Sequence, residues 1–256
     1  SSNMTEKTPL FSIITVTYNA SSVIWPTLMS VKEQTMTDYE YLVVDGASRD
    51  ATVQLVNTAQ VPQTHVWSEE DSGLYDAMNK AIDYAKGKYL IFLNAGDAFA
   101  GPNVLARMAN AAAEDADIIY GQTQLVNEER NVVGMRHLTA PRELTFQSFA
   151  NGMVVCHQAF VAKRAIVGKY DLQYKYSSDY EWCLRCLQVS TKNVYLGDTP
   201  VISFLTQGLT HQHHQESLAE RFQIMCQYFG KVSTVLRHVG FVPRYLMRKI
   251  KKQEKN

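Results

Sequence analysis

The chain has 256 residues, of which 46% are apolar and 20% are charged, and its formal net charge is zero. This length suits one large domain or one domain with a smaller appendage. The neutral balance argues against a nucleic-acid-binding protein, which usually has a basic face. Since no apolar stretch has the length of a membrane span and no signal peptide is recognisable, we expect a cytoplasmic protein.

The first half of the chain alternates short apolar runs with amphipathic segments. The apolar runs predict strands over 10–17, 41–44, 65–68, the start of 88–97, and 117–120. Apolar residues at helical spacing predict helices over 23–34, 50–59, 74–85 and 102–113. Gly87 is expected to end the third helix in a left-handed conformation. This alternation is typical of βαβ units, so we predict an α/β fold with a mostly parallel sheet.

The pattern changes after Gly121. We predict a hairpin over 123–126 and 130–133, a strand over 153–161, a helix to about 190, strands over 193–196 and 201–205, and a helix over 216–229. A capping box of Ser178 and Glu181 would open the first helix. The second would bury Leu218, Phe222, Met225 and Phe229. We therefore expect a nucleotide-binding half over 8–121, a mixed half over 122–230 that completes the same pocket, and a basic tail over 231–256.

Polar side chains follow four predicted strands in succession. They are Thr15, Thr17 and Asn19, then Asp45, then Asp71, then Asp97. The carboxyl ends of parallel strands form a ligand crevice in open α/β sheets. Asp97 has two interpretations: it faces a bound ion or phosphate, or it caps a helix whose first residue is Pro102.

The sequence has neither a G-x-G-x-x-G pattern after the first strand nor a P-loop. A nucleotide diphosphate bound at the crevice would therefore need another counter-charge. Magnesium or manganese held by a carboxylate would supply one, because these ions characteristically bind one or two carboxylates together with substrate phosphates.

The four cysteines, at positions 156, 183, 186 and 226, are too few for a disulfide framework. Cys183 and Cys186 form a C-x-x-C pair, for which a redox or zinc role has to be considered. The pair lies within a predicted helix instead of at its start, where a redox pair would be activated, and no second pair follows it. We favour reduced, mostly buried thiols.

Four segments resemble motifs of the family 2 glycosyltransferases of the GT-A fold, in the correct order and spacing. The segments are Ile13–Asn19 (IITVTYN), Val43–Ser48 (VVDGAS), Asp71–Lys80 (DSGLYDAMNK) and Phe92–Asp97 (FLNAGD). The resemblance spans roughly 10–205 and is closest to the bacterial subgroup that builds capsule, colanic-acid-like and lipopolysaccharide repeat units.

The resemblance implies a Rossmann-like nucleotide-binding sheet flanked by helices, with a smaller mixed subdomain on the acceptor side. It implies an inverting hexosyl- or N-acetylhexosaminyltransferase that uses a nucleotide-sugar, for which we expect a UDP-sugar. The donor-binding positions would be Thr15, Tyr18, Asn19, Asp45, Asp71, Asp76, Asn79, Lys80, Asn94, Ala95 and Gly96. Asp97 would hold Mn²⁺ or Mg²⁺, although Asn94 and Gly96 replace the earlier acidic positions of the usual D-x-D motif.

The segments Cys156–Phe160, Tyr170–Asp171 and Ser177–Trp182 resemble the acceptor region of this subgroup, with His157, Gln158 and Ser178 in the acceptor pocket. Asp179 falls where the family has its catalytic base. The start of a helix favours an ionised carboxylate, and general-base catalysis is worth on the order of 100- to 10,000-fold. The alternative is that Asp179 only complements the helix dipole.

Two features near the C-terminus have open interpretations. His211 or His213 would complete a metal shell, or both belong to a solvated polar loop. The segment Arg244–Lys252 mixes basic, aromatic and aliphatic residues; it would contact the inner face of an anionic membrane that carries a lipid-linked saccharide acceptor, or it is a solvated end. The alternative functions are a non-catalytic nucleotide-sugar-binding protein and, less favoured, a nucleotidyltransferase.

Overall fold

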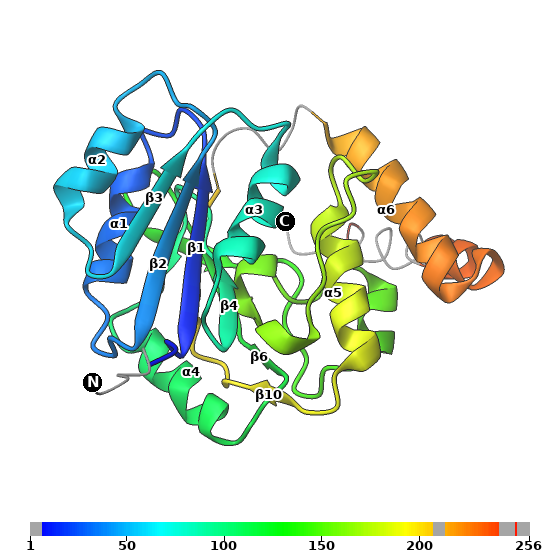
Figure 1. Ribbon diagram of the computed structural model, residues 1–256. Coiled ribbons are helices and arrows are strands. Elements are labelled where there is room, and N and C mark those ends of the chain that lie inside the picture. Colours follow the sequence, from blue (N-terminus) through cyan, green and yellow to red (C-terminus); the bar gives the residue numbers. More distant parts are fainter. Residues whose placement is uncertain (1–6, 207–212, 241–248, 250–256) are drawn as a thin grey trace.

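The structure is a computed structural model that describes residues 7–206, 213–240 and 249. Its centre is a seven-stranded sheet (Figure 1). Its strand order is β10 (Asn193–Tyr195), β6 (Ile118–Tyr120), β9 (Phe160–Lys163), β4 (Tyr89–Phe92), β1 (Phe11–Thr17), β2 (Tyr39–Asp45) and β3 (Thr64–Ser68). The pairs within β4–β1–β2–β3 and the pair β10–β6 are parallel, while β9 is antiparallel to both its neighbours. The predicted mostly parallel α/β sheet is confirmed.

Helices flank the sheet on both sides. They are α1 (Ile24–Lys32), α2 (Thr52–Ala59), α3 (Leu74–Tyr84), α4 (Val104–Ala113), α5 (Ser178–Val189) and α6 (His214–Phe229). In Figure 1, α1 and α2 lie at one flank and α5 and α6 at the other, with α3 between. A second sheet has the order β5 (Ala98–Phe99), β11 (Ile202–Leu205), β7 (Thr123–Val126) and β8 (Val132–Met135).

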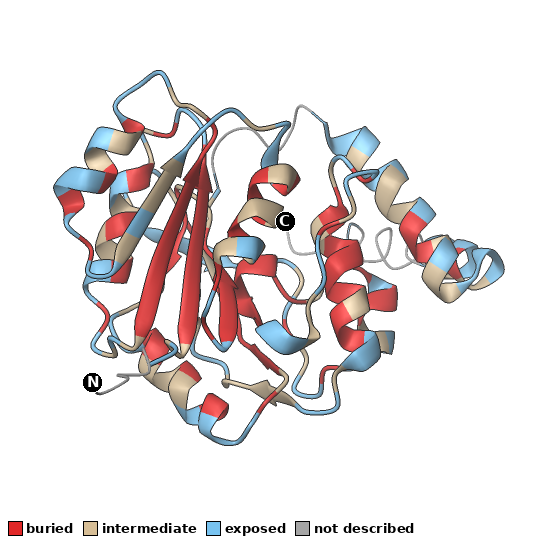
Figure 2. Ribbon diagram, viewed as in Figure 1, coloured by how far each residue is buried: buried red, intermediate tan, exposed pale blue. Residues whose placement is uncertain are grey.

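The core lies where the apolar runs predicted it. Every residue of β1, β2 and β4 is buried (Figure 2), as expected for strands covered on both faces. Close packing also explains Gly87, whose predicted left-handed conformation is wrong, since α3 ends in the extended Ala85. A Cβ atom on Gly87 would lie 2.4 Å from the backbone nitrogen of Ser12, so only glycine lets this loop approach β1.

The predictions for the second half need several corrections. Residues 153–161 do not form one strand: the 3₁₀ helix η2 (His157–Ala159) precedes β9, because His157 and Gln158 turn into the interior. The hairpin is confirmed, but its return strand is β8, two residues later than predicted. Two further 3₁₀ helices are η1 (Phe146–Asn151) and η3 (Arg164–Ile166).

Helix ends and faces also differ from the predictions. The N-cap of α5 is Ser177 without a side-chain cap, so Ser178 and Glu181 form no capping box. Glu181 is buried and accepts hydrogen bonds from Arg185 and Tyr228 instead. On α6, the buried residues are Ile224 and Met225, whereas Leu218, predicted to be buried, is exposed.

Candidate active site

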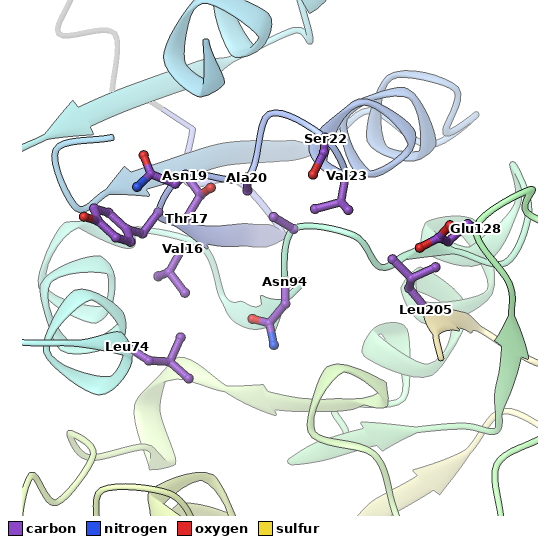
Figure 3. A pocket seen from close by; sticks show the side chains of 12 residues that line it. Val16, Thr17, Asn19, Ala20, Ser22, Val23, Leu74, Asn94, Glu128 and Leu205 are labelled. Carbon is purple, nitrogen blue, oxygen red and sulfur yellow. The ribbon is translucent and has the colours of Figure 1, made fainter. Parts of the chain in front are cut away.

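A cavity of about 490 Å³ opens at the carboxyl ends of β1 and β4 (Figure 3). Its walls come from the loop after β1, the loop after β4, the start of α3, the end of β11 and the β7–β8 turn. The lining residues are Val16, Thr17, Tyr18, Asn19, Ala20, Ser22, Val23, Leu74, Asn94, Ala95, Glu128 and Leu205. Figure 3 shows Asn94, Leu74 and Glu128 arranged around this space. It lies where an open α/β sheet binds its ligand.

A second cavity of about 550 Å³ adjoins the first, because Tyr18 lines both. It is bounded by the loop after β2 and the segment before α3, through Gly46, Ala47, Arg49, Glu70, Asp71, Ser72 and Gly73. The Tyr18 side chain is 62% exposed. An exposed ring between two adjoining cavities offers a stacking surface for a flat ring such as a nucleobase.

Buried side chains hold the loops of this pocket in place. Asp45 accepts hydrogen bonds from the Ser48 backbone nitrogen (2.8 Å) and from the Ser68 hydroxyl (2.7 Å). The Ser48 hydroxyl also receives a hydrogen bond from the Asn19 backbone nitrogen, and Asn19 in turn accepts one from the Arg49 nitrogen. Asp45 is fully buried, so it fixes the shape of the loops that bound the pocket.

The predicted donor contact of Thr15 is wrong. Thr15 is fully buried, and its hydroxyl donates to the Leu93 carbonyl and lies 2.7 Å from the Tyr41 hydroxyl. Thr17, two residues later on the same face, lines the pocket. Its buried hydroxyl oxygen has no hydrogen-bond partner among the described residues.

The segment 71–80 divides into pocket wall and support. Asp71 lines the pocket and lies so close to Gly46 that a Cβ there would be 2.7 Å from an Asp71 oxygen. Asp76 accepts a hydrogen bond from the Ser72 nitrogen and pairs with Lys80 at 3.9 Å. Asp76 and Lys80 therefore stabilise the segment that contributes Ser72 to the pocket wall.

Asn79 does not line the donor cavity. Its side-chain amide donates to the Tyr170 carbonyl (3.0 Å) and accepts from the Tyr170 nitrogen (2.7 Å). This paired contact joins α3 of the first half to the predicted acceptor region, so the structural role of Asn79 is to hold the two halves together.

The loop after β4 carries the Asn94–Asp97 motif and is anchored on all sides. Asn94 and Ala95 line the cavity, and Gly96, at φ 101°, donates its backbone N–H to the Thr27 hydroxyl. Gln158 bridges the loop: its oxygen accepts from the Asn94 nitrogen and its nitrogen donates to Asp97, both at 2.7 Å. Sequence reasoning placed Gln158 in the acceptor pocket, whereas it supports the donor loop.

The environment of Asp97 decides between its two interpretations. Its other carboxylate oxygen accepts from the Leu205 nitrogen at 2.8 Å, while α4 begins at Val104 with Asn103 as N-cap, so Asp97 is not a helix cap. Burial raises the pKa of Asp97 to about 6, against the opposing effects of its two hydrogen bonds and of the Arg130 charge. A buried carboxylate of this kind lacks a sufficient counter-charge.

Asp97 can still bind a cation, because each oxygen accepts one hydrogen bond and a carboxylate has about four lone-pair sites. Among the described residues no three or more His, Cys, Asp or Glu side chains form a metal cluster. A cation held by Asp97 would need its remaining ligands from phosphate and water, and Asp97 is not among the residues that line the cavity.

The structure bears on two of the three histidines that were predicted to lie at the site. His213 pairs with Glu216 at 3.0 Å and stacks on Tyr176, so the structure does not bring it to Asp97. His211 lies outside the described residues. His157 is not a pocket-wall residue: it is buried, stacks on Phe92 and lies 2.7 Å from the Tyr170 hydroxyl.

Asp179 lies in the first turn of α5. One of its oxygens accepts from the Tyr75 hydroxyl (3.2 Å) and from the Tyr180 nitrogen (2.8 Å). Tyr75 follows Leu74, which lines the donor cavity. Ser178 is buried and donates to the Asp171 carbonyl, so it shapes the same turn.

The cysteines are free. Cys156, Cys183 and Cys186 are buried and Cys226 is partly buried, and burial raises the pKa of Cys183 and Cys186. The predicted burial of the thiols is confirmed, and buried thiols of this kind are typically inert.

A mostly parallel sheet with a two-part pocket at its strand ends is the arrangement in which open α/β folds bind their ligands. Residues 12–170 match the family described as glycosyl transferase family 2, and the chain belongs to that family.

Relatives and solved structures agree with this assignment. A PGL/p-HBAD biosynthesis glycosyltransferase of Mycobacterium bovis is 32% identical over 186 residues, which is 70% of each chain. An Escherichia coli UDP-Glc:alpha-D-GlcNAc-diphosphoundecaprenol beta-1,3-glucosyltransferase, WfgD, is 24% identical over 70% of each. The S. aureus TarS 1–349 structure in complex with UDP-GlcNAc superposes with a TM-score of 0.70 at 18% identity, covering 86% of this chain and 72% of TarS 1–349. The expected GT-A fold is confirmed.

Proposed function

We propose that the chain transfers a hexosyl or N-acetylhexosaminyl group from a UDP-sugar to a hydroxyl of a lipid-linked, cell-surface glycan, with inversion at the anomeric carbon. Family membership supports the transfer reaction. The donor and acceptor classes draw support from the UDP-GlcNAc bound to TarS and from the UDP-Glc and diphosphoundecaprenol in the name of WfgD. Residues 8–121 would bind the donor and 122–230 the acceptor.

One observation carries this proposal: two consecutive residues at the start of α3 connect the donor cavity to Asp179. Leu74 lines the cavity, and the Tyr75 hydroxyl donates to the Asp179 carboxylate. Asp179 is not among the residues that line either cavity, but a carboxylate tied in this way to the helix that bounds the cavity can accept a proton from an acceptor hydroxyl. Placement of this kind is worth on the order of 100- to 10,000-fold in rate.

In the proposed reaction, the acceptor oxygen forms a bond to the anomeric carbon as the bond from that carbon to the diphosphate breaks. Asp179 takes the hydroxyl proton, and UDP leaves from the opposite face. Asp179 thus acts as general base, and Tyr75 positions it through a hydroxyl that is shared between the Asp179 carboxylate (3.2 Å) and the Tyr176 carbonyl (3.1 Å).

The donor would occupy the two adjoining cavities. Tyr18 offers a ring to the base, the Asn94 amide faces the ribose or phosphates, and Asp71 bounds the nucleoside side. Asp97 would hold Mn²⁺ or Mg²⁺, which stabilises the charge of a departing diphosphate.

A lipid-linked acceptor makes a peripheral membrane contact useful. Within the described part of the chain, no helix is long and apolar enough to cross a bilayer. Residues 231–240 are helical and expose Val232, Leu236 and Val239 at helical spacing, which gives an apolar face. The basic segment Arg244–Lys252 follows but, except for Lys249, lies outside the described residues. We propose that this region contacts the cytoplasmic face of the membrane.

A panel of nucleotide-sugars tests the proposal. In a thermal-shift assay with Mn²⁺, a UDP-sugar should raise the melting temperature more than the matching GDP- or ADP-sugars. Donor hydrolysis should release free UDP, which a pure binding protein would not do. NMR of the product should show an inverted anomeric configuration. Stabilisation by GDP- or ADP-sugars alone would overturn the choice of donor, and retention would overturn the role of Asp179.

A further inference from the structure

The turn between β7 and β8 contains a strained arginine. The Asn127 nitrogen donates to the Asn131 carbonyl, and the Arg130 nitrogen donates to the Asn127 carbonyl, both at 3.0 Å. Arg130 has φ 66°, the left-handed conformation. Hairpin turns place glycine at such a position, since other side chains are strained there. The backbone of this turn therefore favours glycine, and the arginine requires another explanation.

The Arg130 side chain reaches the donor loop. One guanidinium nitrogen donates to the Gly96 carbonyl at 2.6 Å. Gly96 lies in the chain between Ala95, which lines the cavity, and Asp97. Glu128, two residues away in the same turn, lines the donor cavity opposite Asn94 (Figure 3). The turn thus contributes Glu128 to one wall of the cavity and places the Arg130 guanidinium on the loop that carries Asn94 and Ala95.

The hydrogen bond to Gly96 uses one of the five N–H donors of a guanidinium. A planar guanidinium binds phosphate oxygens in a two-pronged geometry, and such charge-assisted bonds are about twice as strong as neutral ones. The chain also has no glycine-rich phosphate loop, and its donor loop has the single carboxylate Asp97. A cationic group from the protein would add to the counter-charge that a metal ion supplies to a diphosphate at this loop.

We propose that Arg130, anchored on the Gly96 carbonyl, binds the diphosphate of the nucleotide-sugar and stabilises the charge of the departing nucleoside diphosphate. This inference rests on the proposed function of the pocket. It assigns a donor-binding role to the β7–β8 turn, which lies outside the segments that resemble the family motifs.

The substitution Arg130→Gly tests this inference, because it removes the guanidinium and relieves the strained backbone. UDP binding is measured by isothermal titration in the presence of Mn²⁺, and uridine binding by ligand-observed NMR. We expect UDP affinity to fall about 10- to 100-fold, the loss of a charge-assisted hydrogen bond, with uridine affinity little changed. The melting temperature should stay within about 3 °C of the wild type, since the relieved strain offsets the lost Gly96 bond.

Two further variants control the test. Gln60→Gly relieves the left-handed C-cap of α2 (φ 51°), away from the pocket, and should leave UDP binding unchanged. Arg130→Lys retains the charge without the planar fork and should bind UDP with intermediate affinity. Equal UDP affinity for wild type and Arg130→Gly, or equal losses for UDP and uridine, would overturn the role of Arg130 alone. A wild-type protein that binds neither ligand would overturn the proposed donor as well.

Discussion

Replacement of His157 by glutamine should change how the stability of the protein depends on pH. His157 is buried between aromatic rings: the centroid of its ring lies 5.3 Å from those of Phe92 and Trp182. Its Nε2 lies 2.7 Å from the Tyr170 hydroxyl. Burial lowers its pKa from 6.5 to about 4, only weakly opposed by the Asp179 charge. The folded protein therefore holds the neutral imidazole, whereas the unfolded chain takes up a proton near pH 6.5.

The magnitude follows from linkage. Because the folded-state pKa is depressed, the stabilisation is fully present above pH 6.5 and is lost as the pH falls towards 4. The difference between a pKa of 6.5 in the unfolded chain and about 4 in the folded protein corresponds to roughly 3 kcal/mol in the free energy of unfolding. Of this, about 1.4 kcal/mol is lost by pH 5.5 and about 2.5 kcal/mol by pH 4.5.

Urea unfolding of wild type and His157→Gln at several pH values between 7.5 and 4.5 measures this effect. The variant will be less stable at pH 7.5, because glutamine fills the site poorly. The difference in unfolding free energy between wild type and variant should then narrow by about 2–3 kcal/mol at pH 4.5, since the variant has no imidazole to protonate. The matched control is His65→Gln, which replaces an exposed histidine of β3. Parallel stability curves for His157→Gln and wild type would refute the buried neutral imidazole.

Three further predictions concern the site. Asp97→Ala should abolish the dependence of UDP affinity on Mn²⁺; identical titrations of wild type with Mn²⁺ and with EDTA would contradict a metal role. Gln158→Leu should destabilise the protein by about 1–3 kcal/mol, because the Asn94 nitrogen and Asp97 each lose a buried partner, and an unchanged urea midpoint would count against this bridge. Tyr75→Phe should lower kcat while leaving KM for the donor nearly unchanged, since Asp179 loses a hydrogen-bond donor that positions it; an unchanged kcat would rule out the positioning role.

Local patterns in the sequence were sufficient for the sheet. The strands β1, β2 and β4 are continuous apolar runs, and burial on both faces follows from that composition alone. The helix α3 repeats apolar residues on one face, and Tyr75, Met78 and Ala81 are buried as that spacing requires. Polar residues at the strand ends likewise indicated the edge of the sheet where the pocket lies.

Contacts between distant parts of the chain could not be predicted. Gln158 is 61 residues from Asp97, and Arg130 is 34 residues from Gly96, so no local spacing reveals either contact. The S-x-x-E pattern at Ser178 predicted a capping box, but Glu181 is drawn into the interior by Arg185 and Tyr228. In each case the tertiary partner decides the role of the side chain.

The sequence predicts the turn at Arg130 but not its unusual backbone conformation. Asn127 and Asn131 flank a short acidic and basic stretch between two β-prone runs, which indicates a turn. Only the backbone geometry shows that the arginine occupies the position a glycine would favour. A sequence-based search for cations near the Asn94–Asp97 loop would have had no reason to select it.

The central claim, that Asp179 serves as the base beside a separate donor pocket, is tested most directly by assaying transfer and UDP binding with the same Asp179→Asn preparation. Asp83→Asn, which breaks an exposed ion pair with Lys169, serves as the matched control. We predict that sugar transfer by Asp179→Asn falls by at least about 100-fold while its dissociation constant for UDP stays close to the wild-type value. Retained transfer, or an equal loss of transfer and UDP binding, would contradict the account.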